Sequence, residues 1–360
     1  MKNPITLAVL AALSAAGLSS AQTPAYSQPS GYVTITCPAN SDTIVGVPLR
    51  QSAALSGALT AAPSQSAGQA TLSLNNFTGS YANTHYVKFS TGPDAGKILP
   101  VVSNTTTTLV VGLNGDTLTS AQGNTLEVIK FWTLAELFNP ALATTDPLTT
   151  PNAIVASTSA LTAGRRTQIL LPDKAATGIN LSPTSTFFVF SSQWRKVGTA
   201  GDFGTFQLWP DSYMIIRNPS SVTASTKYLA TGQVETASIS IPLATQSGGQ
   251  QDNFVALPRP VDATLDSLNL KDTAAFVSST NSLVSGRKDQ LLVFDNATAL
   301  QNKSPTATYY VLSGQWRKVG SGLNVGTDVI KAGDGFIIRK AATATSQTFF
   351  WLNTPSYNLN

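Results

Sequence analysis

The hexapeptide QWRKVG occurs twice in the chain, at residues 193–198 and again at 315–320. The similarity continues on both sides of it without a gap, so that residues 153–217 align with 275–339 at a fixed offset of 122. About 29 of the 65 aligned positions are identical, which chance does not produce. The chain therefore contains an internal repeat.

Upstream of this region the offset changes. The segment TITCPANSDTIVGVPL (34–49) resembles SISIPLATQSGGQQDNFVALPR (238–259), and aligning Val45 with Val255 gives an offset of 210. Since 210 exceeds 122 by 88, the first copy carries about 88 additional residues, somewhere between residues 57 and 150. The sequence predicts a duplicated domain whose first copy holds an inserted module.

The predicted insert consists of short β-branched runs separated by Gly, Asn, Asp and Pro turn residues. These runs lie at 86–89, 98–102, 107–111 and 126–131, and TLAELF (133–138) is the best helical stretch. Strands at this spacing with tight turns are typical of a small antiparallel barrel or sandwich.

We therefore predict an all-β fold with two tandem homologous domains that resemble β-sandwiches or barrels. The first carries an inserted small β-barrel module with one short helix. The predicted boundaries are 22–57 plus 140–230 for the first repeat domain, 58–139 for the insert and 231–360 for the second repeat domain. The composition agrees with this prediction, because Thr, Ser and Val are abundant and only 11% of the residues are charged.

The N-terminus has the pattern of a secretory signal peptide. A positive residue precedes an apolar run from Ile5 to Leu18, and small residues end at Ala21. We expect cleavage of residues 1–21, and a chain that is secreted or displayed at the envelope surface. No later stretch reaches the roughly 18 apolar residues of a membrane span, so no integral membrane segment is predicted after cleavage.

Charge and cysteine usage limit the partners. The formal net charge is +4, but no basic run exists, so nucleic acid is not a predicted partner. The single cysteine, Cys37, cannot form an internal disulfide. It is interpreted either as a buried inert thiol or as an intermolecular disulfide partner.

The repeated hexapeptide is predicted to form the second strand of a hairpin with a two-residue turn at Ser191-Ser192. This pairing places Val189 opposite Trp194 and Phe188 opposite Arg195. Two interpretations follow. Trp194 and Trp316 are either the central buried aromatics of the two domains, with Arg195 and Arg317 stacked on aromatic neighbours at the rim, or each Trp–Arg face is a platform for a sugar ring. These four residues are the candidate binding residues.

The sequence lacks the residues that several catalytic and binding chemistries require. The only histidine, His85, cannot make a multi-histidine metal site, and no G-x-S-x-G motif accompanies it for a Ser–His–Asp triad. GSGLNVG (320–326) has the wrong glycine spacing for a dinucleotide loop. We therefore predict no catalytic residue, metal ligand or cofactor.

The order of several motifs resembles an uncharacterised family of secreted, mostly β proteins of Verrucomicrobia and related bacteria. The motifs are YVTITCPANSDTIVGVPL, YVKFSTGPDAGKILPV followed by TTLVV, FWTLAELF, QWRKVG and GDGFIIRK. The resemblance spans nearly the whole mature chain and implies no particular activity.

These observations predict an exported, non-enzymatic structural or adhesive protein of the cell surface or extracellular matrix. The predicted partners are other copies of the chain or a cell-surface glycan. The alternatives are a carbohydrate-binding protein with duplicated Trp/Arg faces and, second, a glycan-active hydrolase or lyase.

Overall fold

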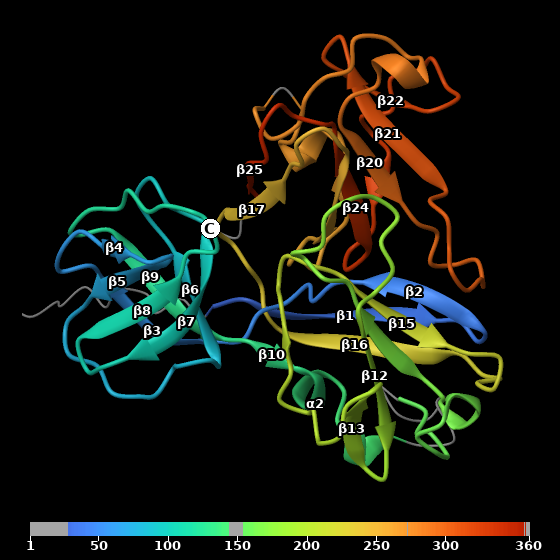
Figure 1. Cartoon of the computed structure of the whole chain (residues 1–360), viewed down its shortest axis with the longest axis horizontal. Helices are drawn as coiled ribbons and strands as arrows, with labels where there is room; N and C mark the ends of the chain where they lie inside the picture. The colour runs from blue at the N-terminus through green and yellow to red at the C-terminus, as the bar shows by residue number, and fades with distance from the viewer. Residues whose placement is uncertain (1–27, 144–153, 272, 356, 358–360) are drawn as a thin grey trace, which may run out of the picture.

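The structure, a computed structural model, describes residues 28–143, 154–271, 273–355 and 357. It is nearly all β, with 42% strand and 5% helix, which confirms the predicted class. Three lobes are visible in Figure 1: strands β3–β9 form one, the first repeat forms a second, and β17–β25 form a third. The predicted signal peptide, residues 1–21, lies outside the described residues.

The first repeat is built around a five-stranded sheet. Its order is β13 (Gln193–Lys196), β12 (Ser185–Phe190), β11 (Gln168–Leu171), β15 (Met214–Asn218) and β2 (Ser41–Val45). Two strand pairs accompany it: β1 (Ser30–Cys37) with β16 (Thr226–Gln233), and β10 (Trp132–Thr133) with β14 (Gln207–Leu208). The 3-10 helices η1 (Pro140–Leu142) and η2 (Thr162–Gly164) lie in its connections.

The second repeat has the same plan. Its five-stranded sheet runs β22 (Gln315–Lys318), β21 (Ala307–Leu312), β20 (Gln290–Val293), β24 (Gly335–Lys340) and β18 (Gln251–Ala256). Its strand pairs are β17 (Ile239–Ala244) with β25 (Thr348–Asn353), and β19 (Ala263–Thr264) with β23 (Val329–Ile330). Its 3-10 helices are η3 (Asp266–Leu268) and η4 (Val284–Gly286). Every sheet thus has a counterpart in the first repeat, strand for strand, as expected of a duplication.

The QWRK strands pair as predicted. Phe188 lies opposite Arg195 and Val189 opposite Trp194, and the second hairpin repeats this register. The turn residues Ser191 and Ser192 have φ values of 52° and 56°, which identifies a type I′ turn. Alternation then sends the Trp and the Arg of each strand to opposite faces of the sheet.

The insert is an open seven-stranded sheet, not the barrel that was predicted. Its order is β3 (Ala53–Ala58), β9 (Thr125–Lys130), β6 (His85–Phe89), β7 (Ile98–Asn104), β8 (Thr108–Gly112), β5 (Gln69–Ser73) and β4 (Ser64–Ser66). Closure would require β4 to pair with β3. Because β4 is a three-residue, exposed polar strand, it ends the sheet instead of joining it to another edge.

The predicted short helix exists, as α2 (Leu134–Leu137), but it packs in the first repeat. A capping box between Thr133 and Glu136 starts the helix. Leu134, Leu137 and Phe138 are buried in the same core as Trp194. The insert has its own core, made by residues of β5–β9 and the neighbouring loops. The predicted domain boundaries are not otherwise tested and stay predictions.

The two repeats meet through reciprocal contacts: equivalent residues of the two repeats make the same contacts across the interface, once in each direction. The Asp42 carboxylate accepts hydrogen bonds from Arg217 of its own repeat and from the backbone N–H of Asn302 in the second repeat. The equivalent Asp252 accepts hydrogen bonds from Arg339 of its own repeat and from the N–H of Asn180 in the first. The same reciprocity holds in the backbone, where Gly46 N donates to Gly333 O and Ala256 N donates to Asp211 O.

Close approach at the centre of this interface requires glycine. A Cβ added at Gly46 would come within 2.1 Å of the Cβ of Ala256, its counterpart in the second repeat. Around this point an apolar cluster contains residues of both repeats, among them Ile44, Tyr213, Phe254 and Ile337. The two repeats are therefore packed together as a pseudo-symmetric pair.

A buried ionic network connects the insert to the repeats. Glu235, which follows β16, accepts a hydrogen bond from Lys88 of β6 at 2.6 Å and an ion pair from Arg50 at 3.3 Å. Glu127 of β9 also contacts both cations. Four charged side chains from segments distant in the chain thus meet where the insert contacts the repeats. No helix in the described ranges is long and apolar enough to cross a membrane.

Candidate functional site

The two predicted tryptophans are core residues. Trp194 and Trp316 are each 0% exposed. The indole N–H of Trp194 donates to Phe138 O at 3.1 Å, and Trp316 packs on Phe276 with ring centroids 5.2 Å apart. Since neither ring face reaches solvent, a sugar platform on these two rings is wrong, and the core interpretation accounts for them.

The predicted arginines lie on the opposite, outer face of each sheet. Arg195 donates to Gly201 O and to Gln193 Oε1, and Arg317 makes the equivalent contacts with Gly322 O and Gln315 Oε1. Their predicted stacking on Phe188 and Tyr310 is wrong, because other arginines occupy those rings.

The arginines that stack there are Arg165 and Arg287. The Arg165 guanidinium lies 5.3 Å from the centroid of Phe188, and that of Arg287 lies 5.7 Å from the centroid of Tyr310. They follow η2 and η4 directly, and these short helices bring them over the hairpins. The sequence contained this signal, since Gly-Arg is kept in both copies, but nothing local indicates which ring each arginine covers.

We call Arg165 and Arg195 the first outer basic face, and Arg287 and Arg317 the second. The first lines a shallow surface hollow of about 290 Å³. Among the described residues, ten lysines and arginines form ion pairs with carboxylates within 4.0 Å, but none of these four arginines does. The chain's unpaired positive charge is thus concentrated in part on two equivalent faces.

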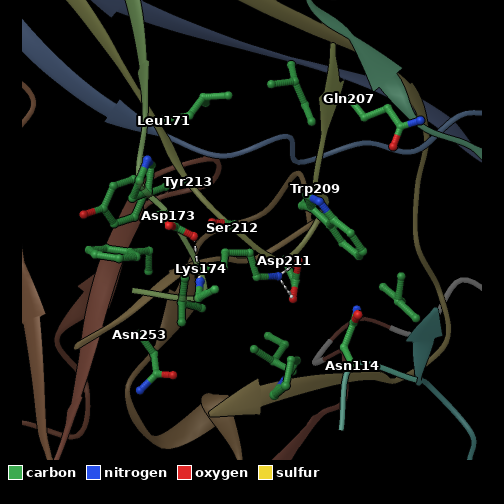
Figure 2. Close-up of a pocket in the computed structure, with 18 of the residues that line it drawn as sticks. Asn114, Leu171, Asp173, Lys174, Gln207, Trp209, Asp211, Ser212, Tyr213 and Asn253 are labelled. Carbon is green, nitrogen blue, oxygen red and sulfur yellow. Dashed lines mark hydrogen bonds and ion pairs between the residues drawn. The ribbon is translucent and has the colours of Figure 1, made fainter. Parts of the chain in front are cut away.

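A larger cavity of about 1000 Å³ lies where the three lobes meet. Its walls come from the insert near Lys97, from the first repeat near Trp209, and from the second repeat near Phe350. Figure 2 shows this junction cavity, with Lys174, Asp211 and Trp209 close together on one wall and Gln207 and Asn114 on others. Because it needs all three lobes, the cavity exists only in the assembled fold.

One wall carries an ion pair against an aromatic ring. Lys174 Nζ lies 2.8 and 2.7 Å from the two carboxylate oxygens of Asp211 and 4.8 Å from the centroid of Trp209 (Figure 2). Asp211 is buried, whereas Lys174 and Trp209 are partly exposed. The indole N–H of Trp209 has no protein acceptor among the described residues, so it is available to a ligand.

A second lysine in the wall has a similar environment. Lys97 contacts Asp94 at 3.1 Å and Asp116 at 2.9 Å and lies 4.8 Å from the ring centroid of Phe350. Burial raises the pKa of Asp94, but hydrogen bonds from Ser120 and Lys97 outweigh it and lower the pKa below its usual value. The cavity thus offers charged and aromatic groups from separate lobes.

The junction cavity was not predicted from the sequence. Its residues Lys174, Trp209 and Asp211 correspond to Asn296, Lys331 and Gly333 in the second copy. The available signal was this departure from the repeat, in which charged and aromatic residues of one copy are lost in the other.

The remaining single residues fit structural roles. Cys37 is 1% exposed, and burial raises the pKa of its thiol to about 11, so the buried-thiol interpretation accounts for it. Burial lowers the pKa of His85, because it disfavours the charged imidazolium, and Nδ1 of His85 hydrogen-bonds with the Thr84 hydroxyl. No group of three or more His, Cys, Asp or Glu side chains suited to a metal is found in the part of the chain that the structure describes.

Fold and surface together define an all-β protein of several separate sheets with duplicated basic faces and one cavity between its lobes. Comparison with protein-family models, with curated proteins and with solved structures gave no match for this chain. The resemblance to a family of secreted β proteins therefore stays a prediction.

Proposed function

We propose that this is an exported, non-enzymatic protein with a structural or adhesive role at the cell surface or in the extracellular matrix. One observation carries the proposal: the duplication presents two equivalent basic faces on repeats that reciprocal contacts pack together. The hairpins that carry these faces lie at opposite ends of the molecule (Figure 1), so one chain can connect two partners or two parts of a matrix.

The outer sheet edges argue against assembly of copies through these strands. On β13, Trp194 O accepts a hydrogen bond from Phe203 N at 2.9 Å, and on β22, Trp316 O accepts one from Val325 N at 3.0 Å. Lys196 O similarly accepts Thr199 N. Since the chain's own loops occupy these outward carbonyls, they are not open for strand addition. Adhesion to another kind of molecule fits the surface better.

The test follows the protein in the producing cells. Culture medium, envelope and cytoplasm are separated, and the full-length chain is compared with a variant lacking residues 1–21. We expect the full-length chain in the medium or envelope and the truncated one in the cytoplasm. The proposal would be contradicted if the full-length protein stayed in the cytoplasm. It would also be contradicted if cells that lack the protein showed unchanged surface attachment and matrix retention.

A second candidate function, carbohydrate binding, is favoured by the junction cavity. A partly exposed Trp209 next to Asp211 and Lys174 combines a ring with hydrogen-bonding groups, the combination that sugar hydroxyls and C–H faces require. Titration with neutral oligosaccharides should quench tryptophan fluorescence in the native chain. The variant Trp209→Ala should lose the quenching, while Trp132→Phe should retain it; equal quenching in Trp209→Ala rules this candidate out.

A further inference from the structure

Arg165 and Arg287 are held in the same way in both repeats. The Nε of Arg165 donates to Ala160 O at 3.0 Å, and the Nε of Arg287 donates to Ser282 O at 3.0 Å. Each guanidinium lies over an aromatic ring. One edge of each group is therefore anchored, and its plane is set by the ring beneath.

The other edge of each guanidinium, with its two terminal nitrogens, can donate hydrogen bonds to a ligand. Neither arginine has a hydrogen bond from its terminal nitrogens to any described residue. The rings underneath are covered, with Phe188 2% and Tyr310 3% exposed, so the arginines and not the rings form the surface. Two terminal nitrogens in one plane match the two oxygens of a carboxylate or sulfate group.

The surroundings reinforce the charge. Arg195 lines the same hollow as Arg165. In the first copy an acid lies in the loop after the strand: Asp202 accepts hydrogen bonds from Trp194 N and Gly204 N. In the second copy Asn324 takes that position, so the second outer basic face lacks even this negative charge.

We propose that the two outer basic faces bind the oxyanion groups of an acidic polysaccharide, with Arg165 and Arg287 each making a bidentate contact. This inference rests on the proposed adhesive function and names its partner. A polymer with repeated carboxylates or sulfates offers many such groups, so the two faces, which lie at opposite ends of the molecule (Figure 1), can bind separate polymer segments. The binding weakens with added salt because exposed charges are screened.

The experiment uses the full mature chain with three probes: polygalacturonate, dextran sulfate and uncharged dextran. Affinity is measured by the retardation of the protein in native gels containing each polymer, at several NaCl concentrations. We expect retardation by one or both charged polymers and none by dextran. The two charged probes distinguish a carboxylate from a sulfate ligand.

Variants separate a built site from general attraction. The double variant Arg165→Gln/Arg287→Gln should lose roughly tenfold or more in affinity, and each single variant less, since one face remains. Lys227→Gln removes one positive charge, as each single arginine variant does, but from an exposed position on β16. It should change affinity by less than about twofold. Arg165→Lys/Arg287→Lys keeps the charge but not the planar fork, and it too should bind more weakly.

Three results would overturn the inference: no retardation by either charged polymer, native-like binding by the double Gln variant, or a loss of affinity in Lys227→Gln equal to that of the single arginine variants. Asp202→Asn supplies an independent check, because it should strengthen binding without touching either arginine. If these tests fail while the protein is still exported and cells still need it for attachment, the inference falls and the proposed function stands.

Discussion

At the residue scale, the repeat contains its own control for a buried ion pair. Asp289 and Lys340 of the second copy are each 1% exposed and hydrogen-bonded to one another. Their counterparts are Thr167 and Asn218, whose side chains hydrogen-bond at 2.8 Å. One scaffold position thus holds a charged pair in one copy and a neutral pair in the other.

This difference predicts a rescue. Lys340→Asn or Asp289→Thr alone should lower the free energy of unfolding by about 3–5 kcal/mol, because a buried charge loses its partner. The double variant, which imports the first copy's neutral pair, should recover most of the loss. Urea unfolding midpoints measure the effect, and a double variant no more stable than the sum of the single changes would contradict it.

The hairpin turns offer a second matched pair. Ser192 and Gly314 occupy equivalent positions with φ values of 56° and 70°. No atom lies within 4 Å of a Cβ added at Gly314, so a substitution there tests backbone conformation alone. Ser192→Gly should stabilise the protein by about 0.5–1 kcal/mol, and Gly314→Ser should destabilise it by a similar amount. Thermal unfolding checks both, and changes of the same sign would refute the argument.

The residue scale also separates successful from unsuccessful predictions. Val189–Trp194 pairing was predictable because a two-residue turn and strand alternation fix the register. The partner of Phe188 was not, because Arg165 reaches that ring from a segment outside the hairpin.

At the element scale, Asp334 links the turn before β24 to strand β2. It forms an isolated bridge with Val45, and Asn296 donates to its side chain at 2.8 Å. Burial raises the pKa of Asp334 to about 6, while the hydrogen bond from Asn296 lowers it. The nearby charges are Asp262 and Asp295, which raise the pKa, and Lys331, which lowers it.

The sign of the pH effect follows from this raised pKa. Between about pH 4 and pH 6 the folded chain keeps a proton that the unfolded chain has lost, so the contribution of Asp334 to stability falls as pH rises. Asp334→Asn keeps the acceptor for Asn296 and removes the titration. The stability of the variant relative to the native chain should therefore rise from pH 4 to pH 7. Chemical denaturation at several pH values measures this difference, and parallel pH profiles would contradict it.

Elements were predictable where their pattern was local. The alternating runs of the insert and the TLAELF helix were located from sequence, but the barrel was wrong. Closure depends on whether the terminal strands of a sheet can pair, and the short polar strand β4 leaves the sheet open.

At the scale of the whole molecule, the buried network around Glu235 connects the insert to the repeats. Glu235→Gln would leave Lys88 and Arg50 with Glu127 as their only carboxylate in this network. We expect a loss of about 3–5 kcal/mol in the free energy of unfolding.

An exposed ion pair provides the control for this prediction. Lys331 and Asp262 are paired at 2.8 Å, but their side chains are 68% and 48% exposed. Asp262→Asn should therefore change stability by less than about 1 kcal/mol. Equal effects of Glu235→Gln and Asp262→Asn in guanidinium unfolding would show that the network is not a structural lock.

The sequence by itself determined the all-β class, the duplication, the presence of an insert and the hairpin of each QWRK strand, because these depend on composition, alternation and the repeat offsets. Only the tertiary structure decided that the tryptophans are buried, that Arg165 and Arg287 form the outer surface, and that three lobes enclose a cavity beside Trp209. The reason is physical: a strand's two faces are equivalent until other segments cover one of them, and here those segments are distant in the chain.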